Sequence, residues 1–169
     1  GVCEAREGKA LAKVFKALEP LSYSRRVLWD ESEPLACPSL LPDWSFGRSA
    51  QTRVTGGTLS AATFEHEEEG ARRGWLLILA VLRKNGDVEP TVLESEEEAS
   101  SEVRKLRAGR GRVVLEEWLT APTCDTGPVA EVHARTWSFS VKGGGFVTKQ
   151  QKKLLRREPC EQPASEEED

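Results

Sequence analysis

The sequence predicts a single α+β domain with a curved, mainly antiparallel sheet of about five strands and two to three helices. Three observations lead to this class. The length of 169 residues suits one domain. A continuous apolar run precedes an Asn-Gly turn, and other segments carry apolar residues at helical spacing. The domain is expected over residues 1–157, with residues 29–51 as a loop-rich segment pinned by aromatic side chains. Residues 158–169, which are rich in Glu, are expected to form a disordered acidic tail.

The clearest strand signal is the apolar run Trp75–Leu82, whose length is typical of a strand buried on both faces. Asn85-Gly86 follows it and favours a type I′ turn, so Val88–Leu93 is the expected return strand of a hairpin. Further strands are expected near residues 52–64, 112–120 and 129–141.

Helices are predicted where apolar residues recur every three or four positions. Ser95–Glu98 has the pattern of a capping box, in which a Ser hydroxyl and a Glu carboxylate satisfy free backbone N–H groups. Val103 and Leu106 continue that segment as a narrow apolar stripe. Helices are therefore expected near residues 7–18, 95–108 and 146–157.

One segment carries an unusual charge. From Val132 to Arg157 there are seven basic residues and no acidic one, whereas the chain as a whole has a formal charge of −4. Aromatic side chains and Gly143–Gly145 are interleaved with these cations, as in surfaces that track phosphates and stack bases. The residues expected to contact an anionic partner, possibly RNA or single-stranded DNA, are Arg135, Trp137, Lys142, Lys149, Lys152, Lys153, Arg156 and Arg157. In the alternative interpretation, Trp137 belongs to the core-facing side of a strand. The solvated side and C-terminal end of the last helix are then formed by Lys149, Lys152, Lys153, Arg156 and Arg157.

The usual catalytic signatures are absent: the sequence has no phosphate-binding P-loop and no Gly-x-Ser-x-Gly elbow. We therefore predict no catalytic residue, no metal site and no cofactor. His66 stands among glutamates, which is typical of a solvated loop rather than of a metal site. One enzymatic alternative remains, in which a Cys124 thiolate in a loop is activated by His133.

The four cysteines, Cys3, Cys37, Cys124 and Cys160, include no Cys-x-x-Cys pair and are sparse for a disulfide scaffold. This favours an intracellular protein in the cytoplasm, the nucleus or an organelle; a secreted binding domain with two disulfides is the less favoured alternative. No membrane span is expected, because the longest apolar run has eight residues and a spanning helix needs roughly 20. The leading hypothesis is a non-enzymatic binding or assembly module, a subunit of a larger complex with protein partners.

Overall fold

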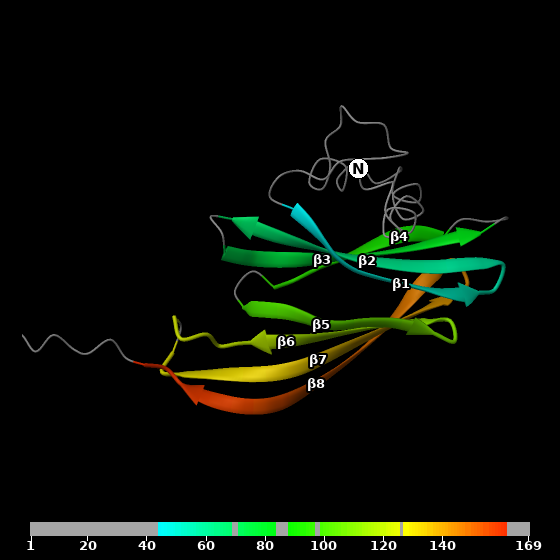
Figure 1. The fold of residues 1–169 in the computed structure, drawn as a ribbon. Helices are drawn as coiled ribbons and strands as arrows, with labels where there is room; N and C mark the ends of the chain where they lie inside the picture. Colours follow the sequence, from blue (N-terminus) through cyan, green and yellow to red (C-terminus); the bar gives the residue numbers. More distant parts are fainter. Residues whose placement is uncertain (1–43, 69–70, 84–87, 97–98, 126, 162–169) are drawn as a thin grey trace, which may run out of the picture.

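The computed structural model describes residues 44–161, apart from residues 69–70, 84–87, 97–98 and 126. This part of the chain contains eight strands and no helix. The strands form two antiparallel sheets, β1-β2-β3-β4 and β5-β6-β7-β8, each of which is a simple up-and-down meander (Figure 1). The α+β class predicted from the sequence is therefore wrong, and the described part of the protein is all-β.

The first sheet consists of β1 (Trp44–Val54), β2 (Gly57–Glu68), β3 (Ala71–Arg83) and β4 (Val88–Glu94). The second sheet consists of β5 (Ser100–Gly109), β6 (Arg112–Thr120), β7 (Val129–Lys142) and β8 (Gly145–Pro159).

The two sheets lie face to face, with β1 against β5 (Figure 1). Their facing sides supply one hydrophobic core, because side chains alternate along each strand and every second one points inward. The largest fully buried apolar side chains of this core are Leu59, Leu77, Leu79, Leu115 and Phe139.

The predicted hairpin is confirmed. All side chains from Trp75 to Val81 are buried, so β3 is covered on both faces, as its unbroken apolar run indicated. β3 pairs with β4 in antiparallel register, with Leu77 opposite Leu93. The turn residues Asn85-Gly86 lie outside the described residues. The strands expected near residues 112–120 and 129–141 are also confirmed, as β6 and β7.

The helix expected at residues 95–108 is wrong, because this segment contains β5. Ser95 does not cap a helix: its backbone N–H donates to the carbonyl oxygen of Trp75, and its hydroxyl accepts a bond from the Trp75 N–H, both at 3.0 Å. The pairing of β5 with β6 shifts between Val103 and Lys105. This β-bulge inserts one residue, so the inward side chains Val103 and Leu106 are three positions apart, which resembles helical spacing.

The helix expected at residues 146–157 is wrong for the same reason, because this segment is β8. Val132 lies opposite Arg156 and His133 lies opposite Leu154, so Leu155 is an extra residue in the strand. The adjacent pair Leu154-Leu155 therefore marks a bulge rather than a helix face. The helix expected at residues 7–18 lies outside the described residues.

Four boundaries of strands and loops also differ from the prediction. Residues 44–51, expected to be loop-rich, belong to β1, and the strand expected at 52–64 contains the β1–β2 turn, where Gly56 has a φ of 77°. β2 continues through Glu68, so His66 lies in a strand rather than in a solvated loop. β8 extends to Pro159, two residues beyond the expected end of the domain.

A disulfide joins Cys124, in the β6–β7 connection, to Cys160, directly after β8. The backbone N–H of Cys160 also donates to the carbonyl oxygen of Pro128 at 2.9 Å. These two contacts fasten the end of β8 to the β6–β7 connection. Cys3 and Cys37 lie outside the described residues. Among the described residues there is no helix long and apolar enough to cross a membrane.

The core makes a first prediction. Phe139 is 1% exposed, and Phe139→Ala is expected to lower the free energy of unfolding by about 3–5 kcal/mol, because it leaves a cavity between the sheets. Val147 is 36% exposed, so Val147→Ala is expected to cost less than about 1 kcal/mol. Urea denaturation of both variants checks this. Equal losses would show that the space between the sheets is not the core.

Candidate nucleic-acid interface

The second sheet has one face turned away from the first sheet, here called the outer face (Figure 1). Its residues follow from the register. One row of neighbours across the four strands consists of Arg107, Val114, Ser138 and Lys149. The adjacent residues Leu106, Leu115 and Trp137 point inward, to the core or its margin. Because side chains alternate along a strand, the row that includes Arg107 and Lys149 points outward.

The outer face has cations along its two margins, and most of the side chains between them are short. The strands β6 and β7 contribute a floor of half-buried side chains that includes Val114, Thr136, Ser138 and Ser140. Exposed cations on β5 border one side and those on β8 the other, with Arg112 at the end of the floor. The cations of the outer face are Arg104, Lys105, Arg107, Arg112, Lys149, Lys153 and Arg156.

Trp118 lies on this floor and joins the two margins. The guanidinium carbon of Arg104, from β5, lies 4.1 Å from the centroid of the Trp118 ring, and that of Arg156, from β8, lies 5.8 Å away. Residue 134, which separates Trp118 from β8, is alanine, and its small side chain leaves room for Arg156 to reach the ring. Both contacts are within cation–π range.

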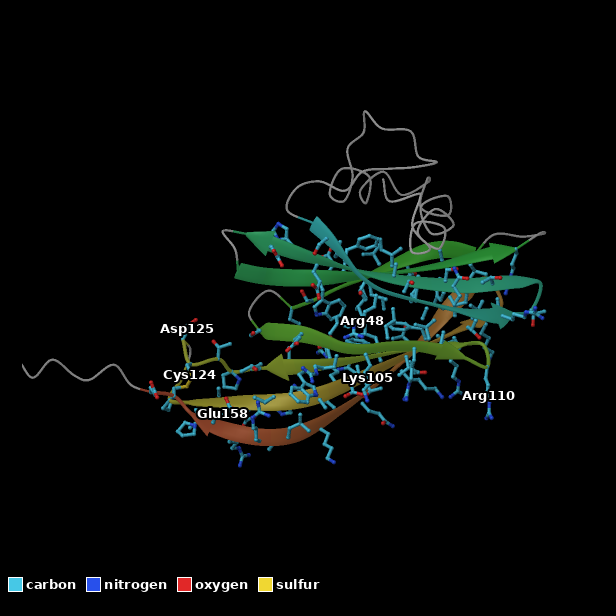
Figure 2. All side chains as sticks on the ribbon, in the orientation of Figure 1. Arg48, Lys105, Arg110, Cys124, Asp125 and Glu158 are labelled. Carbon is cyan, nitrogen blue, oxygen red and sulfur yellow. A yellow bond between two sulfur atoms is a disulfide. The ribbon has the colours of Figure 1, made fainter. Side chains whose placement is uncertain are left out.

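The outer face keeps an excess of positive charge after its acids are counted. Arg104 pairs with Glu102 at 3.4 Å, and Arg156 pairs with Glu158; Glu116 is the third acid of this face. The remaining cations of the face form no ion pair with another described residue. They are Lys105, Arg107, Arg112, Lys149 and Lys153. Figure 2 shows Lys105 on the second sheet, with Cys124 and Glu158 at one end of that sheet and Arg110 at the other.

Arg135, a predicted contact residue, lies on the inner face instead. Its Nε donates to Oε1 of Glu117 at 2.7 Å, its Nη2 lies 2.5 Å from the same oxygen, and its Nη1 lies 2.5 Å from Oε1 of Glu96. Glu117 has no exposed surface. Burial raises the pKa of Glu117, and the charge of Arg135 opposes that shift. The guanidinium of Arg135 is therefore already occupied by two carboxylates.

Trp137 is also an inner-face residue. Its ring stacks on that of Phe139, with centroids 6.3 Å apart and planes 7° apart, and the Arg135 guanidinium carbon lies 5.0 Å from its centroid. Lys152 lies opposite Arg135 and so shares the inner side of the sheet, although it is exposed. Arg157 pairs with Glu131 at 3.1 Å.

Of the residues predicted from the sequence, the outer face brings together Lys149, Lys153 and Arg156. Lys142 is exposed at the end of β7. The cations of β5 and of the β5–β6 turn were missed as part of the site because residues 95–108 were interpreted as a helix. The signal was present in the sequence, since residues 103–115 contain five basic residues and no acid.

The structure does not support the enzymatic alternative, in which a Cys124 thiolate is activated by His133. Cys124 is bonded to Cys160, so it has no thiolate in this form of the protein. Nε2 of His133 lies 3.8 Å from Oε2 of Glu131. Within the described part of the chain, no group of three or more His, Cys, Asp or Glu residues is placed to hold a metal ion.

No protein-family model, no curated protein and no solved structure matches this chain.

The buried ion pair makes a second prediction. Arg135→Met leaves Glu117 buried without its counter-charge, so the free energy of unfolding near pH 7 is expected to fall by about 3–5 kcal/mol. The pKa of Glu117 in the folded protein then rises further above its value in the unfolded chain. The folded state holds a proton that the unfolded state releases, so stability is regained as the pH falls toward the unfolded pKa.

Urea denaturation across a pH series measures both effects. The matched control is Arg157→Met, which removes an arginine that is 65% exposed and is expected to cost less than about 1 kcal/mol. The interpretation fails if Arg135→Met is as mild as this control, or if its loss of stability is larger in acid than at neutral pH.

Proposed function

We propose that the protein is a non-enzymatic binding module that holds single-stranded RNA or DNA on the outer face of β5–β8. The observation that carries the proposal is the meeting of two acid-free segments on one exposed face. Residues 103–115 supply one cationic margin, and residues 145–157 of β8, which precede Glu158, supply the other. Each segment alone supplies only one of the two cationic margins.

The arrangement of the cations suits a phosphate backbone. Neighbouring strands lie roughly 4.8 Å apart, so the margins on β5 and β8 are separated by about three such spacings. A single strand lying between them contacts cations on either side, and each phosphate that is neutralised releases counterions. Because Lys105, Lys149 and Lys153 have no ion pair with another described residue, no such pair has to be broken when a phosphate binds them.

The floor between the margins suits bases rather than a duplex. The guanidinium planes of Arg104 and Arg156, which lie over the ring of Trp118, are groups on which unpaired bases stack, and duplex bases are already stacked on one another. The hydroxyls of Thr136, Ser138 and Ser140 can donate and accept hydrogen bonds at base edges or sugar hydroxyls.

A protein partner in a larger assembly is a second proposal, favoured by the free edge of β8. This edge strand exposes Val147, Leu154 and Leu155, each between 36% and 40%. An added strand could pair with its backbone. A pull-down with and without nuclease separates the two roles, because partners held through nucleic acid are lost and partners held by β8 remain.

The proposed interface makes a third prediction, which uses the alternation of β8. The double variant Lys149→Gln/Lys153→Gln neutralises two outer-face cations. It is expected to weaken binding of single strands by about ten- to thirty-fold, and to flatten the salt dependence by roughly 0.7 in slope for each lost phosphate contact. Fluorescence anisotropy with labelled oligo(U) and oligo(dT) across a salt series measures both quantities.

The control is Lys152→Gln/Arg157→Gln, which removes the same charge from the same strand but from its other side. It is expected to leave the slope nearly unchanged. Equal effects of the two double variants would show that net charge, not the outer face, drives binding. An intact protein that retains no single strand at low salt would refute the proposal.

A further inference from the structure

The tip of the β5–β6 hairpin holds a pocket of about 770 Å³, at the end of the outer face away from Trp118. Among the residues that the structure describes, the pocket is lined by Arg107, Ala108, Gly109, Arg110, Arg112 and Val114, so three of these six are arginines and none is acidic.

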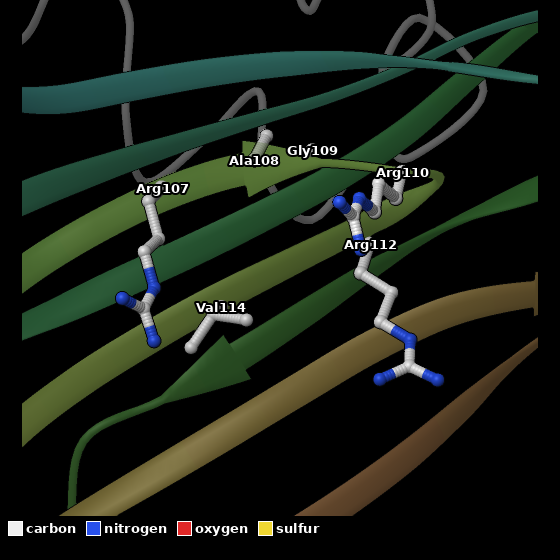
Figure 3. A pocket seen from close by; sticks show the side chains of 6 residues that line it. All are labelled: Arg107, Ala108, Gly109, Arg110, Arg112 and Val114. Atoms are coloured by element: carbon white, nitrogen blue, oxygen red, sulfur yellow. The ribbon is translucent and has the colours of Figure 1, made fainter.

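The three arginines surround the end of the hairpin, and two of them lie on the same side of it. Figure 3 shows the side chains of Arg107 and Arg112 reaching to the same side of the two strands, with Val114 between them. The register agrees, because Arg107 lies opposite Val114 and Arg112 lies opposite Gly109. All three arginines are exposed, and none pairs with an acid among the described residues. Three like charges gathered without counter-ions favour an anion at this place.

The hairpin turn places these side chains on a fixed backbone. Arg110 and Gly111 have φ values of 52° and 76°, as both central residues of a type I′ turn require. The Gly111 N–H donates to Oγ1 of Thr52 at 3.0 Å, which ties the tip to β1 in the other sheet. Gly and Asn are the residues that such positions favour, so an arginine at position 110 is unusual for this turn.

We infer that this pocket binds a terminal phosphate, that is, a phosphate monoester or a polyphosphate carrying about two negative charges or more. A monoester presents three oxygens and nearly two charges, which three guanidinium groups can match with paired hydrogen bonds. A phosphodiester offers one charge and two free oxygens and leaves one of the arginines unmatched. Val114 provides apolar surface for the group attached to the phosphate.

Two sources carry this chemistry: the phosphorylated end of a strand lying on the outer face, and a free nucleoside polyphosphate. The first source rests on the function proposed above, and the second does not. The experiment therefore uses both kinds of ligand on the full chain. Oligonucleotides of one sequence carry a 5′-phosphate, a 3′-phosphate or only hydroxyl ends. Separate samples receive a nucleoside triphosphate or inorganic pyrophosphate.

The pocket variant is Arg110→Gly/Arg112→Gln. Glycine is favoured at a positive φ, so this variant keeps the turn while it removes two cations; circular dichroism and thermal melting check that it folds. Anisotropy of the oligonucleotides and isothermal titration of the free phosphates measure binding. The outer-face variant Lys149→Gln/Lys153→Gln serves as the control, since it removes the same charge outside the pocket.

With the first source, a phosphorylated end is expected to bind about tenfold tighter than a hydroxyl end, as expected for charge-assisted hydrogen bonds. The pocket variant abolishes this preference and the control variant keeps it. With the second source, the triphosphate binds the unmodified protein without any strand, and only the pocket variant loses that binding. If neither a phosphorylated end nor a free polyphosphate is preferred, the inference is wrong even where hydroxyl-ended strands still bind. If hydroxyl-ended strands fail to bind but the triphosphate binds in the pocket, the proposed function is wrong and the pocket stands.

Discussion

The buried ion pair between Glu117 and Arg135 is the contact on which the second sheet depends. Glu117 has no exposed surface and stands among the apolar inward residues of β6, and an uncompensated carboxylate there would be strongly destabilising. Arg135 meets it from β7 and also reaches Glu96, in the connection between the two sheets. A slip of one residue between β6 and β7 would break these contacts and turn every side chain to the opposite face. The pair therefore fixes which residues face outward, including Trp118, Thr136 and Ser138.

The strands that were predicted from the sequence and those that were not differ in where their pattern is interrupted; in β3 the irregularity in its pairing with β2 lies at residues 72–74, before the apolar run. β3 is continuously apolar across its buried segment, and in the second half of β7 Trp137, Phe139 and Val141 alternate with polar residues, so an unbroken run and a period of two predicted these strands. β5 and β8 each contain a bulge, which inserts a residue and moves the next inward side chain by one position. In β5 the inward pair Val103 and Leu106 acquires helical spacing in this way. Whether a strand contains a bulge depends on its pairing with a neighbouring strand. A short stretch of sequence does not show that pairing.

The same distinction explains which part of the candidate site was predictable. The charge of β8 was visible as a segment without acids, but a helix would place Lys149, Lys152, Lys153 and Arg156 together, whereas a strand separates Lys152 from Lys153. The cations of residues 103–115 were equally visible. Their alignment with β8 was not, because two further strands lie between β5 and β8. Composition thus indicated a basic surface, and only the topology shows that it has two margins, one floor and one end pocket.

Under the proposed function, these parts would act differently on a bound strand. Cations along both margins would attract phosphates over about a Debye length and hold a backbone without regard to its direction. The acidic remainder of a chain whose net charge is −4 would repel the same polymer and so favour its binding at this face. A surface can select one direction of a bound strand only if its two ends differ, and the two ends of the outer face do differ. At one end Arg104 and Arg156 cover Trp118, whereas at the other Arg107, Arg110 and Arg112 surround an open pocket. A strand whose terminal phosphate occupies that pocket can lie on the floor in one direction only, so the hairpin would set the polarity that the margins leave undetermined.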